Sequence, residues 1–223
     1  MDRKAVFLAS MALAAVGLWG QGSGSSYRPA GVSKAGDIPF PSNSTVTGLV
    51  TLGISVGSDG SVQNVSVIRD LPPLTAAAQD GLKNWQFAPA VENGKMVEGN
   101  CRVQIIFNPF NPGDTTIPGG SEPAATAADG SDAEFQPAQL ESAEFASYPE
   151  NTVASGTVVL QLGVDAEGGV SGARVFRGAG PLAGAATRTA KNWKFTAATY
   201  KGTAVSSVVP VAFVFASPAQ GTP

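Results

Sequence analysis

The sequence predicts an α+β protein made of two tandem domains. Each domain has a β-β-α-β order, in which a three-stranded antiparallel sheet carries one helix packed on one face. The first observation is an internal repeat: AAAQDGLKNWQFAPA at residues 76–90 returns as GAATRTAKNWKFTAA at residues 184–198, a shift of 108 positions, and such a repeat indicates one structural unit written twice. The second is the alternation of apolar and polar residues around this segment, which is typical of strands. The third is the helical spacing of apolar residues inside it.

The composition excludes several classes of function. The 223 residues carry a net charge of −3, so the electrostatic footprint of a nucleic-acid-binding protein is missing. The chain has no histidine, which removes imidazole metal ligands and histidine general bases. Cys101 is the single cysteine, so an intrachain disulfide is impossible. We expect its side chain to act as a small buried hydrophobe, with a reactive thiol as the alternative.

Residues 1–20 have the pattern of a secretory signal peptide. Arg3 and Lys4 precede an apolar run at residues 5–19, which is short of the roughly 20 residues that span a bilayer. We therefore expect export to the periplasm or cell envelope with cleavage after Gly20. The alternative is an uncleaved inner-membrane anchor, the one case in which membrane association is expected. Residues 21–44, rich in Gly, Ser and Pro, are expected to form a flexible lead-in.

The first domain is predicted over residues 45–108. GLVTLGISV at 48–56 alternates as a half-buried strand, and Asp59-Gly60 signals a tight turn into a second strand at 62–69. An apolar stripe that ends at Trp85 predicts the helix. A third strand is expected at 97–107.

The second domain is predicted over residues 148–216 with the same order of elements. Between the domains, residues 109–147 form an acidic linker rich in Gly, Pro and Ala, so the two domains are expected to fold separately. Residues 217–223 are a tail. The tryptophans could stack on a sugar, but their place on the helical stripe favours core packing. The residues expected in the two cores are Leu74, Trp85, Phe87, Leu182, Trp193 and Phe195.

No catalytic site, metal site or cofactor is predicted. Asp59 and Glu167 occupy equivalent turn positions, and turn geometry accounts for them. Arg69 and Arg177 occupy equivalent strand ends, where a solvated role is favoured over ligand binding. No nucleophile with a base, and no pair of carboxylates, is left to support an enzyme.

One motif runs through both copies of the repeat. In the first copy it is carried by Gly48, Val50, Leu52, Val56, Asp59, Gly60, Val62, Val65, Val67, Ala77, Ala78, Trp85, Phe87, Pro89, Ala90, Gly94, Val97, Val103, Ile105 and Phe107. This motif resembles the C-terminal domain of TonB, an energy-transducing protein family. The second copy departs from the pattern at Ala197, where the first has Pro89, and at Glu167, where the first has Asp59.

The resemblance implies a non-enzymatic envelope protein that binds outer-membrane TonB-dependent transporters, which are β-barrels, by β-strand addition during energy-coupled transport. It also implies that the third strand is the accepting edge. The second copy has Pro210 in this strand where the first has Arg102, and proline withholds a hydrogen bond from an added strand, so the first domain is expected to accept the partner. The predicted partner-binding residues are Val97, Cys101, Arg102, Val103, Ile105 and Phe107.

One departure from the family concerns reach across the envelope. The lead-in at residues 21–44 extends at most about 80 Å, whereas an energy transducer is expected to have a long Pro-rich spacer. The alternative function is therefore a secreted structural or scaffolding module whose TonB-like domains bind an envelope polymer or each other. The sequence indicates neither the oligomeric state nor the identity of a partner.

Overall fold

The computed structural model describes residues 27–42, 44–109, 117, 134–149, 152–178 and 180–216. The predicted signal peptide, the C-terminal tail and most of the linker lie outside these residues. The described part is an α+β structure with many strands and two helices in two similar halves, as the sequence predicts. The repeat shift of 108 residues relates the elements of one half to those of the other.

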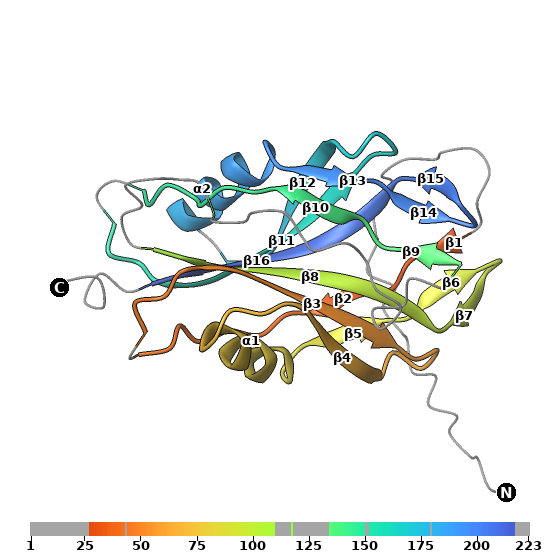
Figure 1. The fold of residues 1–223 in the computed structure, drawn as a ribbon, viewed down its shortest axis with the longest axis horizontal. Coiled ribbons are helices and arrows are strands. Elements are labelled where there is room, and N and C mark those ends of the chain that lie inside the picture. Colours follow the sequence, from red (N-terminus) through yellow and green to blue (C-terminus); the bar gives the residue numbers. More distant parts are fainter. Residues whose placement is uncertain are drawn as a thin grey trace, which may run out of the picture.

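A single six-stranded sheet runs through both halves, in the order β12-β11-β16-β8-β3-β4. The expectation of two separate three-stranded sheets is therefore wrong. Four neighbour pairs are antiparallel, while β16 and β8 run parallel at the centre. Figure 1 shows this continuous sheet, with the second half above the first. The strands are β3 (Gly48–Val56), β4 (Val62–Arg69), β8 (Gly99–Asn108), β11 (Gly156–Val164), β12 (Val170–Arg177) and β16 (Ser207–Phe215).

The two helices cover opposite faces of the sheet (Figure 1). The helix α1 (Leu74–Leu82) follows β4, and α2 (Gly180–Ala190) follows β12. The equivalent strands β8 and β16 pair in parallel. A rotation of half a turn about an axis that runs between them, along the strand direction, superposes one on the other. The same rotation exchanges the two faces of the sheet. The halves are therefore related by an approximate two-fold axis between β8 and β16.

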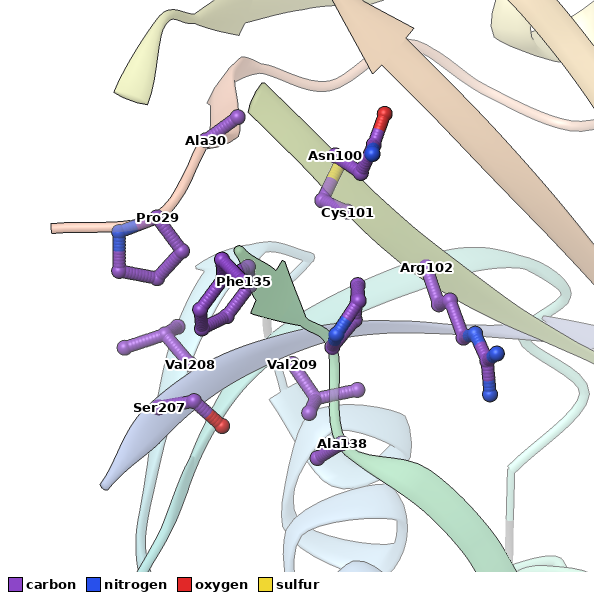
Figure 2. Close-up of a pocket in the computed structure, with 11 residues that line it drawn as sticks. Pro29, Ala30, Asn100, Cys101, Arg102, Phe135, Ala138, Ser207, Val208 and Val209 are labelled. Atoms are coloured by element: carbon purple, nitrogen blue, oxygen red, sulfur yellow. The ribbon is translucent and has the colours of Figure 1, made fainter. Parts of the chain in front are cut away.

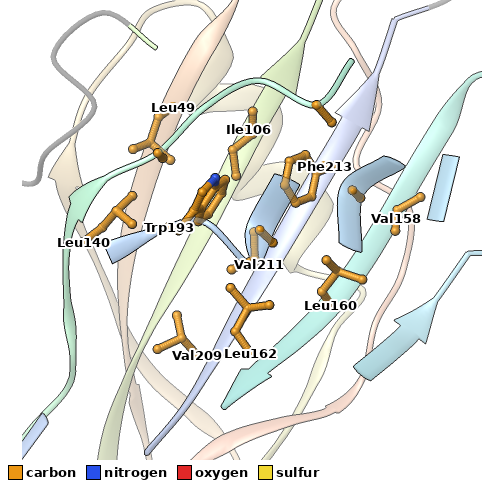
Figure 3. Close-up of a cluster of buried hydrophobic side chains, with 14 of the residues drawn as sticks. Leu49, Ile106, Leu140, Val158, Leu160, Leu162, Trp193, Val209, Val211 and Phe213 are labelled. Carbon is orange, nitrogen blue, oxygen red and sulfur yellow. The ribbon is translucent and has the colours of Figure 1, made fainter. Parts of the chain in front are cut away.

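Each core contains residues from both halves. The cluster under α1 includes Val159 and Ala212 of the second half, and the cluster under α2 includes Leu49 and Ile106 of the first half. Figure 3 shows Trp193 among Leu49, Ile106 and Phe213. Because apolar residues are buried on both faces, the central strands have nearly continuous burial rather than the alternation expected of a half-buried strand.

All six residues assigned to the cores are buried. Trp85 also donates its indole N–H to the carbonyl of Gly36 at 3.2 Å. Cys101 is buried, and desolvation raises the pKa of its thiol to about 12, so it is a packed hydrophobe rather than a reactive nucleophile.

The segments that precede each domain are structured, which corrects the expectation of a flexible lead-in at 21–44. The described residues 27–42 contain two strands, and residues 134–147, assigned to the linker, contain their counterparts. Both segments form antiparallel ladders with the strands after the helix of their own half. The short strands are β1 (Tyr27–Arg28), β2 (Gly31–Lys34), β5 (Gln86–Ala88), β6 (Ala90–Glu92) and β7 (Lys95–Val97), and in the second half β9 (Phe135–Gln136), β10 (Gln139–Ser142), β13 (Lys194–Thr196), β14 (Ala198–Tyr200) and β15 (Thr203–Val205).

Candidate functional site: the paired third strands

The strand predicted to accept a partner is not an edge of the sheet. β8 lies between β3 and β16 and pairs with both. Of the six predicted binding residues, Val97 belongs to the short strand β7, and the other five lie in β8 and are buried. The assignment of an open accepting edge to these residues is therefore wrong for this structure. The side of β8 that was expected to be open is covered by β16, the equivalent strand of the second copy. No local pattern in the sequence shows that these two strands pair.

The contact between the third strands is a parallel ladder. Residues 104–108 of β8 pair with residues 211–215 of β16, and Ile105 lies opposite Ala212. Both strands also pair along their other side with the first strand of their own half. Pro210 stands one residue before the first paired residue, Val211, so the β8 ladder begins only after the proline.

Ahead of this ladder the two strands diverge, and other parts of the chain fill the gap. Figure 2 shows a small cavity between β8 and β16, whose lining includes Cys101 and Arg102 of β8, Ser207 and Val209 of β16, and Phe135 of β9. The cavity has a volume of about 10 Å³, which is room for about one water molecule. This part of β8 is therefore enclosed and cannot receive an additional strand.

Each half is held to the other by a polar side chain that binds a backbone peptide group. Thr157 Oγ1 accepts a hydrogen bond from Ile38 N at 2.9 Å and donates one to Ile38 O at 3.1 Å. Asn108 Oδ1 accepts from Ala146 N at 2.8 Å, and its Nδ2 donates to Ala146 O at 2.9 Å. Ile38 and Ala146 are equivalent in the repeat. The segment before each domain thus pairs with strands of its own half and is also hydrogen-bonded to the opposite half.

A second contact joins the halves where the short hairpins meet. Tyr27 stacks on Tyr200 with ring centroids 4.7 Å apart and contacts Phe135 at 5.0 Å. The hydroxyl of Tyr200 donates to Glu92, and Lys201 forms an ion pair with the same Glu92 at 3.7 Å. Burial raises the pKa of Tyr27 to about 12, and the neighbouring Tyr200, Glu92 and Glu134 add to this rise.

An ion pair on the outside also crosses between the halves. Arg177 donates from Nε and Nη2 to the carboxylate of Asp37. The side chains of both residues are well exposed, so the pair orients the segment more than it stabilises the fold. Of the two equivalent strand-end arginines, Arg177 thus has a structural role, because it binds Asp37 of the other half.

These contacts define a class of protein: a tandem α+β chain whose two repeats associate through their third strands into one pseudo-symmetric body. The family model described as the Gram-negative bacterial TonB protein C-terminal matches residues 43–109 and 146–216. The two matches cover more than half of the chain, which therefore belongs to the TonB C-terminal domain family, in two tandem copies. Searches of curated proteins and of solved structures gave no match.

Family membership makes the chain a TonB-like envelope protein of a non-enzymatic domain type. Within the described ranges, no helix is both long enough and apolar enough to cross a membrane. The same residues contain no cluster of three or more acidic or cysteine side chains suited to a metal ion.

Single sequence motifs do not reveal the residues that join the halves. Asn108 and Thr157 lie at the ends of strands and carry no local signal of their role. The preceding segments did carry a signal, because Pro29-Ala30 is repeated as Pro137-Ala138 at the same shift of 108 residues. Extending the repeat by these residues would have moved them from the lead-in and linker into the folded halves.

Proposed function

We propose that this protein is a non-enzymatic binding protein of the bacterial envelope in which two TonB-type domains work as one closed body. Its protein partners would bind surfaces that remain open on that body, not the third strands. The observation that carries the proposal is the parallel pairing of residues 104–108 with residues 211–215. This pairing occupies the backbone groups that strand addition to β8 or β16 would require.

The closed body favours a scaffolding role over a mobile energy transducer. Opening the third strands would break the central ladder and also separate Thr157 from Ile38 and Asn108 from Ala146. Each separation leaves buried backbone groups without partners, at a cost of about 1–3 kcal/mol per group. A transporter segment would have to offset all of these losses before gaining any new hydrogen bond.

The test is to compare the closed body with a form whose third strands are covalently joined. Ile105 and Ala212 lie opposite each other in the ladder, so Ile105→Cys with Ala212→Cys is placed for a disulfide. Cys101→Val first removes the natural thiol and introduces the residue type that stands at the equivalent position 209. Oxidation then fixes the third strands together, and reduction restores their freedom.

We expect envelope proteins captured from membranes to bind the oxidised and reduced forms equally. Peptides from the N-terminal segments of outer-membrane TonB-dependent transporters should bind neither form strongly. The proposal is overturned if such peptides bind the reduced form and lose binding on oxidation. That result would instead assign the chain to energy-coupled transport through a transiently opened β8.

We further propose that the chain is exported and acts in the periplasm. The basic start and the apolar run at residues 5–19 support export. N-terminal sequencing of the purified protein should give a start near residue 21. A retained residue 1 would indicate an inner-membrane anchor.

A further inference from the structure

Pairing of the third strands leaves the six-stranded sheet with two outer edges, β4 and β12. These strands are equivalent in the repeat, but their exposed side chains differ. On β4, Val62, Val65 and Val67 are 43%, 37% and 42% exposed, whereas on β12 only Val175, at 41%, is a large exposed hydrophobic residue. The first half therefore presents a longer apolar edge than the second.

Substitutions between the copies change the second edge in one direction. Ser66 of β4 is replaced by Arg174 in β12, and Val65 is replaced by Ala173. A charged residue in the middle of an edge strand hinders pairing with another strand, and loss of a β-branched residue weakens cross-strand packing. The charge of Arg174 thus opposes strand pairing at the β12 edge, and the β4 edge has no charged residue at the equivalent position.

We propose that β4 is a self-association edge, through which two copies of this chain pair antiparallel, β4 against β4. The pairing would join two six-stranded sheets into one continuous sheet across a two-fold axis. A two-fold contact uses the same surface on both copies and closes after two. It therefore satisfies the open backbone groups of β4 without growth into a fibre.

The charges along the first edge are complementary to a second copy. No charged residue occurs from Val62 to Ile68, whereas Asp59 precedes this stretch and Arg69 follows it. When the two-fold axis passes at Val65, each Arg69 lies opposite Ser61 of the second copy, beside the turn that carries Asp59. Opposite charges then meet at both ends of the contact. The same arrangement of β12 would place the two Arg174 side chains diagonally across from each other, within reach of like-charge repulsion.

This register also packs the exposed valines. The two Val65 side chains lie opposite each other, and each Val67 lies diagonally across from Val65 of the second copy, within the spacing at which cross-strand pairs interact. The fold already contains one contact between third strands of the two repeats, a parallel ladder at the centre of the sheet.

The experiment is sedimentation velocity on the full chain over a wide range of micromolar concentrations. We expect a species of twice the 22.5 kDa chain mass that dissociates on dilution. Val67→Arg should raise the dimer dissociation constant at least about tenfold, because it places a charge in the centre of the apolar edge. Ser66→Arg, which introduces the residue type found in β12, should act in the same direction.

The matched control is Val175→Arg, at the equivalent position of the other edge and with nearly the same exposure as Val67. It should leave the dimer intact. Urea unfolding of each variant checks that the fold is retained. A chain that stays monomeric at every concentration overturns the proposal, and so does equal loss of association in Val67→Arg and Val175→Arg, which would indicate pairing of β4 with β12.

Discussion

Thr157→Val tests how strongly the two halves depend on each other. The substitution keeps the shape of the side chain but removes the hydroxyl, which holds both the N–H and the C=O of Ile38 at 2.9 and 3.1 Å. Ile38 is buried in the core under α1, so both groups lose their partner away from water. At about 1–3 kcal/mol for each of the two unsatisfied groups, the free energy of unfolding should fall by about 2–6 kcal/mol.

Urea unfolding gives the size of this loss, and hydrogen exchange read by mass spectrometry gives its location. Thr157 belongs to the second half, yet Ile38 precedes the first domain. We therefore expect the protection of slowly exchanging amides to fall by the same free energy in β3 and in β11. Ser171→Ala is the control: its hydroxyl donates to Gly163 O from an exposed position, so the loss should stay within about 0.5 kcal/mol.

The reasoning is refuted if Thr157→Val lowers protection only in the second half. That result would mean that the first half folds without the hydrogen bonds from Thr157. It is also refuted if urea unfolding shows two separate transitions in the unmodified protein.

Three further predictions concern side chains that are buried or partly buried. Trp85→Ala and Trp193→Ala should each lower stability by about 3–5 kcal/mol and should unfold both halves in circular dichroism; loss of one half alone would contradict this. The Cys101 thiol, with its pKa raised to about 12 by burial, should not react with a thiol reagent at neutral pH until urea unfolds the chain, and rapid native labelling would count against the buried position. The folded pKa of Tyr27 is raised from 10.0 to about 12, so its contribution to stability is fully present below pH 10 and lost as the pH rises toward 12; Tyr27→Phe should remove this alkaline loss, and an unchanged alkaline transition would disprove the assignment.

The sequence predicts the elements of each half better than their assembly. Trp85 and Trp193, found from the helical stripe, are indeed buried, because local periodicity reports which face of a helix is apolar. The alternation at residues 48–56 predicts a half-buried strand, yet Thr51, one of its polar residues, is fully buried and donates to Gln104 at 2.7 Å. A polar side chain can be buried once it has a partner, and no period in the sequence reveals that partner.

The turns give a similar lesson. Asp59 was assigned to turn geometry, and its carboxylate accepts hydrogen bonds from the backbone and hydroxyl of Ser61. Glu167 was given the equivalent position, but Asp165 performs the corresponding role by accepting from Gly169 N at 2.7 Å. The two repeats therefore form the same turn, but the carboxylate that stabilises it comes from a different position in each repeat.

The candidate site could not be predicted, because its two sides are far apart in the sequence. The motif identified the third strand in each copy, and the family suggested that this strand receives a partner. Neither the motif nor the family indicates that β8 and β16 are neighbours. Parallel strands are not joined by a short hairpin turn, so the sequence carries no local signal of their pairing. Family membership therefore predicts the domain, while the tandem arrangement decides which edge stays open.

The most direct test of the closed body is to cut the connection between its halves. A specific protease site placed in residues 118–133 divides the chain without altering the described elements. The account predicts that the two fragments stay together on a sizing column at the mass of the intact 22.5 kDa chain, and that amides at 104–108 and 211–215 remain protected from exchange. Two fragments that elute separately, each still folded, would contradict it.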